Sequence, residues 1–388
     1  MIKSPLAALL AIPFLGGAAL SAEFSAAADE GAILDDLRNV SIVASTVPAN
    51  GDVNPYGIAR VPVTQGRLRQ GHVLVSNFNN QANLQGTGTT IVDVAPGGAV
   101  SLFAQIDAAK LPEPCPGGVG LTTALVVLRA GWVVVGSLPT ADGTSATAQA
   151  GCLIVLNNEG VPTNVFAGSP INGPWDMAAI DRGSEASVFF TNVLNGTVAA
   201  GGQVADQGTV VRLDLDLNEV PSAKSFTVIA SGLPTRTDPA ALVIGPTGLG
   251  FTPNRPCALF EAADCEPAGS HTNDRVLYVA DTLNSRVAVI GEPLTRADSA
   301  GPGDTLSANG FLNGPLGLSV APNGHILTVN ANDGFISEIA PDGTQLAHES
   351  VDDTGNPPGA GTLFGVLTDG NGKIFFVDDG SNTLNLLH

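Results

Sequence analysis

The stretch "GPLGLSVAPNGHILTVNANDGFISEI", residues 314–339, joins three short apolar runs through turn-forming residues. Between the first two runs stands "APNG", in which Asn and Gly adopt left-handed backbone at little cost and therefore favour a hairpin turn. A second turn, "ANDG", precedes the run "FISEI". The stretch therefore predicts a meander of three antiparallel strands.

The same pattern recurs along the chain, which makes it a repeat. Apolar first strands are expected at residues 54–61, 120–128, 173–180, 245–251, 314–320 and 361–367. Second strands are expected at residues 72–77, 132–136, 188–192, 276–281, 325–330 and 373–378, and a third strand follows each of them. The chain therefore contains six units of three or four strands.

The last unit is incomplete, because the chain ends at His388 directly after its third strand. The segment "NVSIVASTV", residues 39–47, has no other partner and is expected to cover the exposed edge that remains. We therefore predict an all-β fold, a six-bladed β-propeller whose ring is closed by an N-terminal strand. The expected blades are 54–110, 115–168, 171–232, 241–310, 312–353, and 359–388 together with 39–47.

The composition agrees with this fold and limits the possible partners. The 388 residues include 47 Gly and 27 Pro, and only 13% are charged, which is typical of an all-β chain. The formal net charge of -20 repels phosphate backbones and anionic lipids, which argues against nucleic acid and membrane partners. Ring closure removes free sheet edges and favours a monomer.

Residues 1–28 are typical of a cleaved Sec-type signal peptide, because Lys3 precedes a short apolar run and then small residues. This predicts a secreted or periplasmic protein without a membrane span. In such an oxidising compartment, four cysteines indicate two disulfides. Cys257 and Cys265 are expected to close the Pro-rich insertion that contains them, which leaves Cys115 to pair with Cys152.

Propeller geometry brings the starts of the first strands and the ends of the second strands to one face. The first strands open with Tyr56, Thr122, Trp175, Thr247, Leu316 and Phe364, and the second strands end in Asn77, Gly136, Asn192, Asp281, Asn330 and Asp378. Long loops at 78–89, 137–151 and 195–208 are expected at the same face. We predict a ligand-binding site at this channel mouth, formed by Tyr56, Trp175, Asp176, Asn192, Asn77 and Phe364. The alternative is that the aromatic rings only plug the channel.

Asp281 ends the strand "VLYVAD" and has two interpretations. Five of the six units carry Asn or Asp at this position, and a residue repeated in nearly every blade is most simply structural. Short polar side chains at strand ends accept hydrogen bonds from turn amides. The alternative is a catalytic or metal-binding carboxylate.

Units four to six resemble NHL repeats, in which a P-x-G strand is followed by a hairpin of the form YVAD-x-x-N-x-R-V. "GPTGLGF" and "VLYVADTLNSRVAVI" carry this likeness, which covers roughly residues 240–388. The resemblance implies a propeller fold and says little about activity, because such repeats occur in binding modules and enzymes.

A second resemblance is to the SMP-30/gluconolactonase group of six-bladed lactonases. That resemblance implies a calcium or zinc ion held by a Glu, two Asn and an Asp, with the Asp as catalytic base. Asp281 matches the Asp, and Asn192 is a further candidate metal ligand. Tyr56, Trp175 and Thr247 stand in place of the other ligands.

Two functions follow from these observations. The first is a binding or interaction module that contacts a small molecule or protein at the channel mouth, without a cofactor. The alternative is a divalent-metal-dependent hydrolase, lactonase or lyase centred on Asp281 and Asp176. Other catalytic sets are not indicated, because the five His residues are scattered and no G-x-S-x-G motif occurs.

Overall fold

The computed structural model describes residues 31–252 and 275–388. The chain divides into two units, and the elements described below belong to the second, Ala32–His388. The expected signal peptide and the expected Cys257–Cys265 disulfide lie outside the described residues. Within the described residues, no helix has the length and apolar character needed to cross a membrane.

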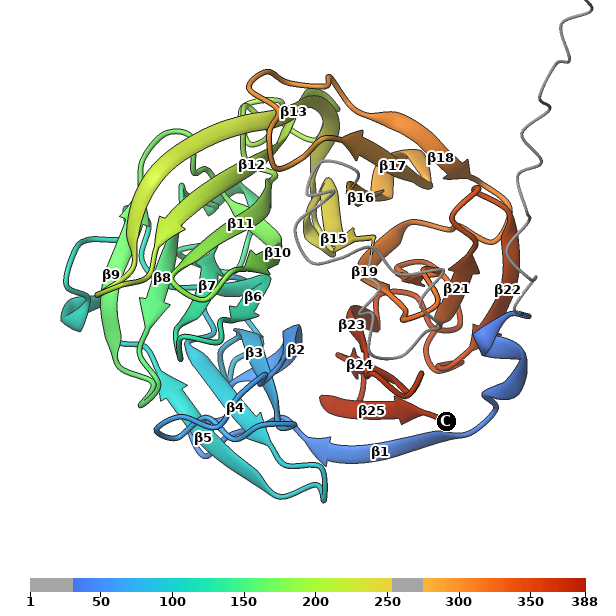
Figure 1. The fold of residues 1–388 in the computed structure, drawn as a ribbon, viewed down its shortest axis with the longest axis horizontal. Helices are drawn as coiled ribbons and strands as arrows, with labels where there is room; N and C mark the ends of the chain where they lie inside the picture. Colours follow the sequence, from blue (N-terminus) through green and yellow to red (C-terminus); the bar gives the residue numbers. More distant parts are fainter. Residues whose placement is uncertain (1–30, 253–274) are drawn as a thin grey trace, which may run out of the picture. The chain divides into compact units, whose positions relative to one another are not determined.

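Six antiparallel sheets follow one another around a central axis (Figure 1). The first two are β2 (Val53–Arg60), β3 (Val73–Asn79), β4 (Thr90–Val94) and β5 (Val100–Gln105), then β6 (Leu121–Val127), β7 (Val133–Ser137), β8 (Cys152–Leu156) and β9 (Pro162–Ala167). The third has five strands, β10 (Pro174–Asp181), β11 (Glu185–Asn192), β12 (Ala205–Asp216), β13 (Ser222–Asp238) and β14 (Leu242–Ile244).

The fourth sheet contains β15 (Pro246–Phe251), β16 (Val276–Asp281), β17 (Arg286–Gly291) and β18 (Asp304–Ala308). The fifth contains β19 (Pro315–Val320), β20 (Ile326–Asn330), β21 (Phe335–Ile339) and β22 (Gln345–Ser350). The sixth contains β23 (Leu363–Thr368), β24 (Ile374–Asp378), β25 (Thr383–Leu387) and β1 (Val40–Ser45). The prediction of a six-bladed β-propeller is confirmed.

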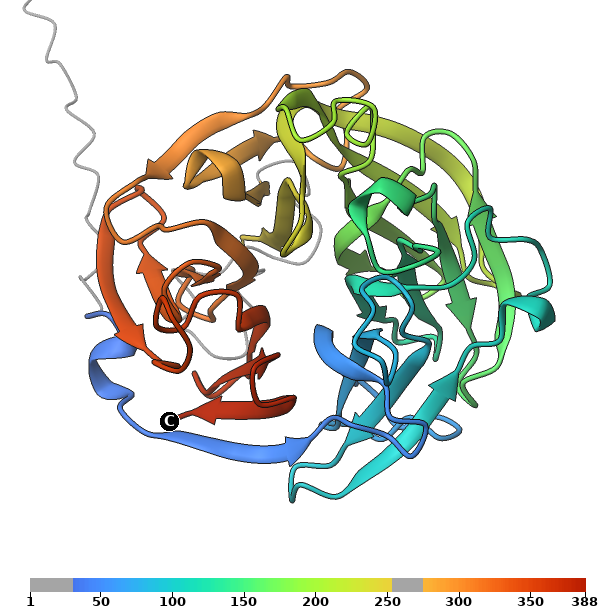
Figure 2. The same cartoon turned by 180° about the vertical axis from the view of Figure 1, so that it is seen from behind.

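The ring is closed by β1, which lies along the outer side of β25 (Figure 2). The two strands run antiparallel, with Val40 opposite Leu387 and Ser45 opposite Thr383. Asn39 and His388 exchange two backbone hydrogen bonds just beyond this pairing. The predicted closure by an N-terminal strand is therefore confirmed.

A buried carboxylate fixes the segment that leads into β1. Glu338 on β21 accepts hydrogen bonds from the backbone amides of Ile33 and Leu34, each at 2.9 Å, in the short helix η1 (Ile33–Asp36). His325 contacts the same carboxylate. Glu338 is fully buried, so these groups satisfy a charge that would otherwise be costly. The closing strand is therefore anchored to the fifth blade as well as the sixth.

Glu338→Gln is expected to lower the free energy of unfolding by about 2 kcal/mol, because one of the two η1 amides loses its acceptor and the charge is lost. Chemical unfolding of both proteins measures this difference. Glu349→Gln is the matched control on β22, where an exposed ion pair with Arg38 contributes about 0.5 kcal/mol or less. Equal effects of the two substitutions would contradict the anchoring role.

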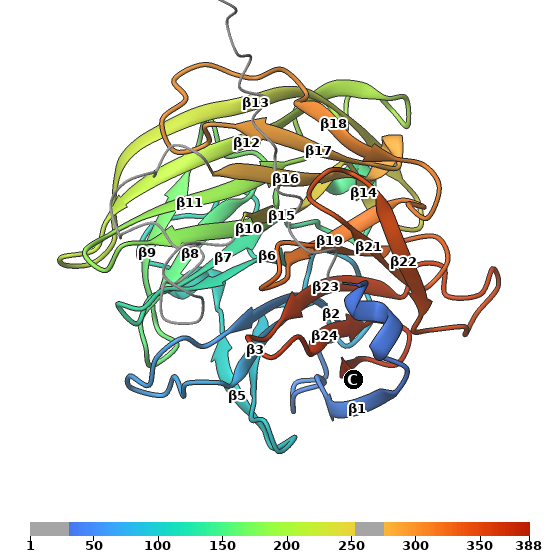
Figure 3. The same cartoon turned by 45° about the vertical axis from the view of Figure 1, so that its right-hand side comes forward.

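The hydrophobic core lies between neighbouring blades, as expected for a propeller. Separate apolar clusters join blades one and two, two and three, three and four, four and five, and five and six. Figure 3 shows these sheets from the side; β12 and β13 are the two longest strands. The predicted Cys115–Cys152 disulfide is confirmed and ties β8 to the segment before β6.

Candidate functional site

The innermost strand of every blade is irregular at the same place. Pro174 pairs with Asn192 and the next pair is Met177 with Phe190, so β10 uses one residue more than β11 between them. Blades one, four, five and six show the same shift, and the second blade has one residue more again. This register makes Ser137 equivalent to Asn192, which corrects the expected Gly136.

Glycine occupies the same place at the bulge in most inner strands. The position after each opening residue holds Gly57, Thr123, Asp176, Gly248, Gly317 and Gly365. An added Cβ on Gly248 or Gly317 would lie 2.3 Å or 2.1 Å from a neighbouring backbone oxygen. Most blades therefore require glycine here, because the inner strands approach each other too closely for a side chain. Thr123 and Asp176 are the exceptions, and of the six residues only Asp176 carries an ionisable side chain.

Asp176 lies in a cavity of about 60 Å³ in the channel. Its backbone amide donates to Thr191, and its Oδ1 accepts from the Met177 amide at 2.7 Å. Burial raises the pKa of the Asp176 carboxyl to about 7, although the Met177 and Leu249 amides oppose this rise. A carboxyl with this pKa is half ionised near neutral pH and suits acid–base chemistry.

A wider vestibule of about 340 Å³ lies next to this cavity. Both spaces are lined by the same ring of apolar side chains, Ile58, Met177, Leu249, Leu318 and Val366. The vestibule extends along the later residues of the inner strands, from this ring to Arg60, Phe251 and Val320. A ligand entering from that side would reach Asp176 past aliphatic side chains with polar groups exposed between them.

The other end of the channel is filled by aromatic rings. The ring centroid of Tyr56 lies 3.9 Å from that of Phe364 and 4.5 Å from that of Phe78, and Trp175 packs edge-on at 5.8 Å. Tyr56 is 1% exposed, Trp175 3% and Phe364 8%. Leu242 and Val243 of β14 pack on the same cluster. The predicted aromatic mouth is thus a plug, and these side chains present almost no surface to a ligand.

Asn77 and Asn192, also predicted as ligand contacts, are buried and hold connections between blades. Asn192 donates to the Pro170 carbonyl at 2.9 Å and accepts from the Asn172 amide at 2.9 Å. Asn77 donates to the Thr46 carbonyl at 3.0 Å. Asn330 binds the Phe311 carbonyl in the same way. These hydrogen bonds support a structural explanation for the repeated polar residue.

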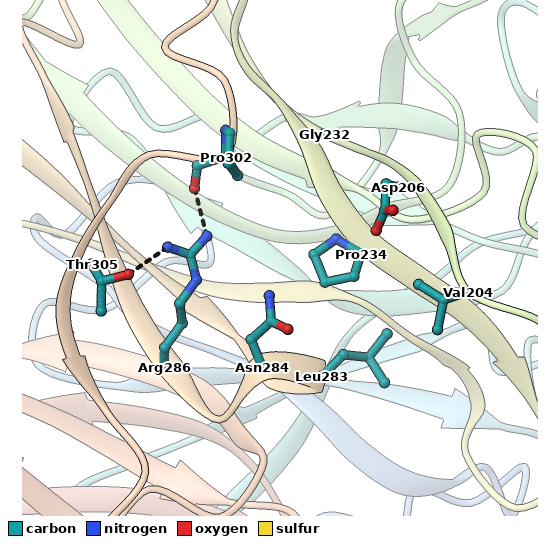
Figure 4. A pocket seen from close by; sticks show the side chains of 9 residues that line it. All are labelled: Val204, Asp206, Gly232, Pro234, Leu283, Asn284, Arg286, Pro302 and Thr305. Carbon is teal, nitrogen blue, oxygen red and sulfur yellow. Dashed lines mark hydrogen bonds between the residues drawn. The ribbon is translucent and has the colours of Figure 1, made fainter.

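Asp281 stands at the end of the second strand like these Asn residues, but its partner is a charged arginine. Its fully buried Oδ2 accepts from Arg286 Nε at 2.7 Å and from Asn284 Nδ2 at 2.9 Å. The Arg286 guanidinium also donates to the Pro302 carbonyl and to Thr305 Oγ1, as the dashed lines in Figure 4 show. Asp281 therefore orients an arginine that holds the connection between β17 and β18.

The groove drawn in Figure 4 is larger than the channel, with a volume of about 560 Å³. It lies between β12 and β13 on one side and the fourth blade on the other. Arg286, its one cationic lining residue in the described part of the chain, is already bound to Asp281, Pro302 and Thr305. The channel is the stronger candidate site, because Asp176 is an acid–base group set directly in its wall.

The predicted metal ligands do not form a metal site. Both Asn192 and Asp281 Oδ2 are already satisfied by protein groups. In residues 31–252 and 275–388, no three His, Cys, Asp or Glu side chains are grouped in a way that could hold a metal ion. Asp281 Oδ1 lacks a hydrogen-bond partner in the same part of the chain, but a single oxygen beside an arginine is a poor ligand set for a divalent ion.

Asp379 was not singled out by sequence reasoning. Burial, together with the charge of Asp378, raises the pKa of the Asp379 carboxyl to about 7. Burial, together with the charge of Asp379, raises the pKa of Tyr56 in the plug. The signal in the sequence was the pair of adjacent acids in "FVDDG". Asp379 lines neither the groove of Figure 4 nor the cavity and vestibule of the channel, so we give it no catalytic role.

Comparisons with known proteins extend the fold assignment. No protein-family model matches the chain, and no curated protein does. Similar solved structures include a gluconolactonase from Xanthomonas campestris, at 14% identity and a TM-score of 0.52 over 91% of this chain and 89% of that one. A luciferin-regenerating enzyme is similar at 12% identity and a TM-score of 0.53, over 90% of this chain and 94% of that one.

A protein from Thermus thermophilus with the provisional name oxidoreductase (glucose dehydrogenase) gives a TM-score of 0.51 at 13% identity. That alignment covers 91% of this chain and 100% of the other. At such identities the likeness establishes the propeller fold and leaves activity to be argued from the site.

Proposed function

We propose that this protein is an enzyme that acts on a small molecule in its central channel, with Asp176 as the acid–base residue. The observation that carries the proposal is the exchange of a ring glycine for a carboxyl with a pKa of about 7 in a small cavity of the channel. The names of the similar structures, a gluconolactonase and a luciferin-regenerating enzyme, support an enzyme more than an interaction module.

The reaction class that fits best is hydrolysis of an ester or lactone. Ionised Asp176 would take a proton from water as the water oxygen bonds to the carbonyl carbon. The carbon–oxygen single bond of the ester would then break, and the protonated carboxyl would return the proton to the leaving alcohol. The aliphatic side chains that line the vestibule support a substrate with an aliphatic part.

The interaction-module hypothesis has less support, because its proposed contacts Tyr56, Trp175 and Phe364 are buried in the plug. The metal-dependent form of the enzyme hypothesis also has less support, because the predicted ligands have protein partners. We derive no step through a metal ion.

The test is a panel of aliphatic lactones and esters, with proton release or product formation as the readout, in the presence and absence of a chelator. Turnover of at least one compound is expected, unaffected by the chelator. Its rate is expected to rise with pH through about 7, because Asp176 acts as a base only when ionised. Hydrolysis that stops on chelation would favour the metal-dependent alternative, and no hydrolysis of any compound would contradict the proposal.

A further inference from the structure

A second set of equivalent positions on the inner strands also contains one exceptional residue. Three positions beyond the glycine ring, or four in the second blade with its longer bulge, the inner strands carry Arg60, Val127, Ala179, Phe251, Val320 and Thr368. Five of these six side chains are uncharged, and Arg60 is the exception. Asp176 and Arg60 are the only ionisable groups among the described residues that line the cavity and the vestibule.

Arg60 has no competing partner in the described part of the chain. It is exposed at the end of β2, and it forms neither a hydrogen bond through its guanidinium nor an ion pair with a described residue. This contrasts with Arg286 and Arg212, which are bound to carboxylates and backbone carbonyls. The Arg60 guanidinium is therefore available to a ligand.

The spacing of the two groups defines the size of that ligand. Asp176 is level with Gly57, and Arg60 lies three residues further along the same inner layer. At about 3.3 Å per strand residue, the two levels are about 10 Å apart. With carbon–carbon bonds of about 1.5 Å, a saturated chain of about eight carbons spans this length. Between the two levels the lining side chains are mostly aliphatic.

We propose that the channel binds amphipathic carboxylates, whose anionic end pairs with Arg60 while a neutral polar end reaches Asp176. Guanidinium groups bind carboxylates through paired, charge-assisted hydrogen bonds. A protein with a formal net charge of -20 otherwise repels an anion, so a cation at the vestibule is needed to hold one. This inference names the substrate class of the proposed enzyme and therefore rests on the same channel.

The test uses 8-hydroxyoctanoate and its uncharged analogue 1,8-octanediol, with affinity measured by titration calorimetry. The native protein is expected to bind the hydroxy acid more tightly than the diol. Arg60→Gln is expected to weaken binding of the hydroxy acid at least tenfold and to leave binding of the diol unchanged. Arg129→Gln is the control, because Arg129 follows the neighbouring inner strand β6 but does not line the vestibule.

An equal effect of the two Arg substitutions, or no binding of either compound by the native protein, would overturn the inference. The two proposals can fail separately. Arg60-dependent binding without any ester or lactone turnover would contradict the enzyme proposal and support the proposed ligand class. Turnover that depends on Asp176 but is unaffected by Arg60→Gln and by the substrate carboxylate would support the enzyme proposal and contradict the proposed ligand class.

Discussion

Asp176→Asn is expected to lower ester or lactone turnover by a factor of about 10²–10⁴, which is the usual contribution of a general base. The amide has nearly the same shape as the carboxyl but cannot accept the proton. Its oxygen can still accept the Met177 amide hydrogen bond, so the inner strand keeps its local structure. Rates measured under saturating substrate, with folding checked by circular dichroism, provide the test.

The stability of this variant gives an independent check. The pKa of Asp176 is higher in the folded state, about 7, than in an unfolded chain, so the folded state binds more protons between those two values. The associated stability is complete below the unfolded pKa and is lost as the pH rises through about 7. Asp176→Asn, which cannot ionise, is therefore expected to be more stable than the native protein above pH 7.

Two controls sharpen the result. Asp176→Gly restores the residue found in most other blades and should also be folded and inactive. Asp206→Asn removes an exposed carboxylate from the groove in Figure 4 and should leave turnover unchanged. Full activity in Asp176→Asn would exclude the proposed acid–base role.

Asp281→Ala is expected to cost about 3–5 kcal/mol of folding free energy, because it leaves the buried Arg286 charge without its carboxylate. Turnover per folded molecule should not change, since Asp281 lines neither the cavity nor the vestibule. Denaturant unfolding measures the first effect, and rates below the unfolding transition measure the second.

The double variant Asp281→Ala with Arg286→Leu tests the cause of that loss. Removing both partners leaves no unpaired charge, so part of the lost stability should return. A stable Asp281→Ala protein without turnover would instead restore the catalytic interpretation of this residue. The sequence alone could not decide between the two, because the partner Arg286 is identified only by its contact with Asp281.

The repeat made the fold predictable to the level of blade number and ring closure. Alternating apolar runs and Asn–Gly turns are local signals, and the leftover strand at 39–47 followed from counting. The plug was not predictable with certainty, because an open mouth and a packed one have the same aromatic residues. Only the packing of Tyr56 between Phe78 and Phe364 distinguishes them.

Asp176 and Arg60 differed in how easily the sequence alone could identify them. Asp176 stood out because the equivalent residue in four other units is glycine. Arg60 could be identified only from the strand register, which shows which residues of the inner strands are equivalent. In the sequence it is an ordinary arginine at the polar end of a strand. The fifth strand of the third blade was missed because β13 continues through "GLPTRTD", which contains both Gly and Pro.

The pairing of β1 with β25 also orders the events of biosynthesis. On the ribosome, β1 is made before any complete blade, whereas β25 is made after the other five blades. Blades one to five can form without the last strand, but β1 must stay unpaired until β25 has been made. A nascent chain stalled before β25 would therefore hold an open arc of blades with a free apolar edge, a natural point of engagement for chaperones.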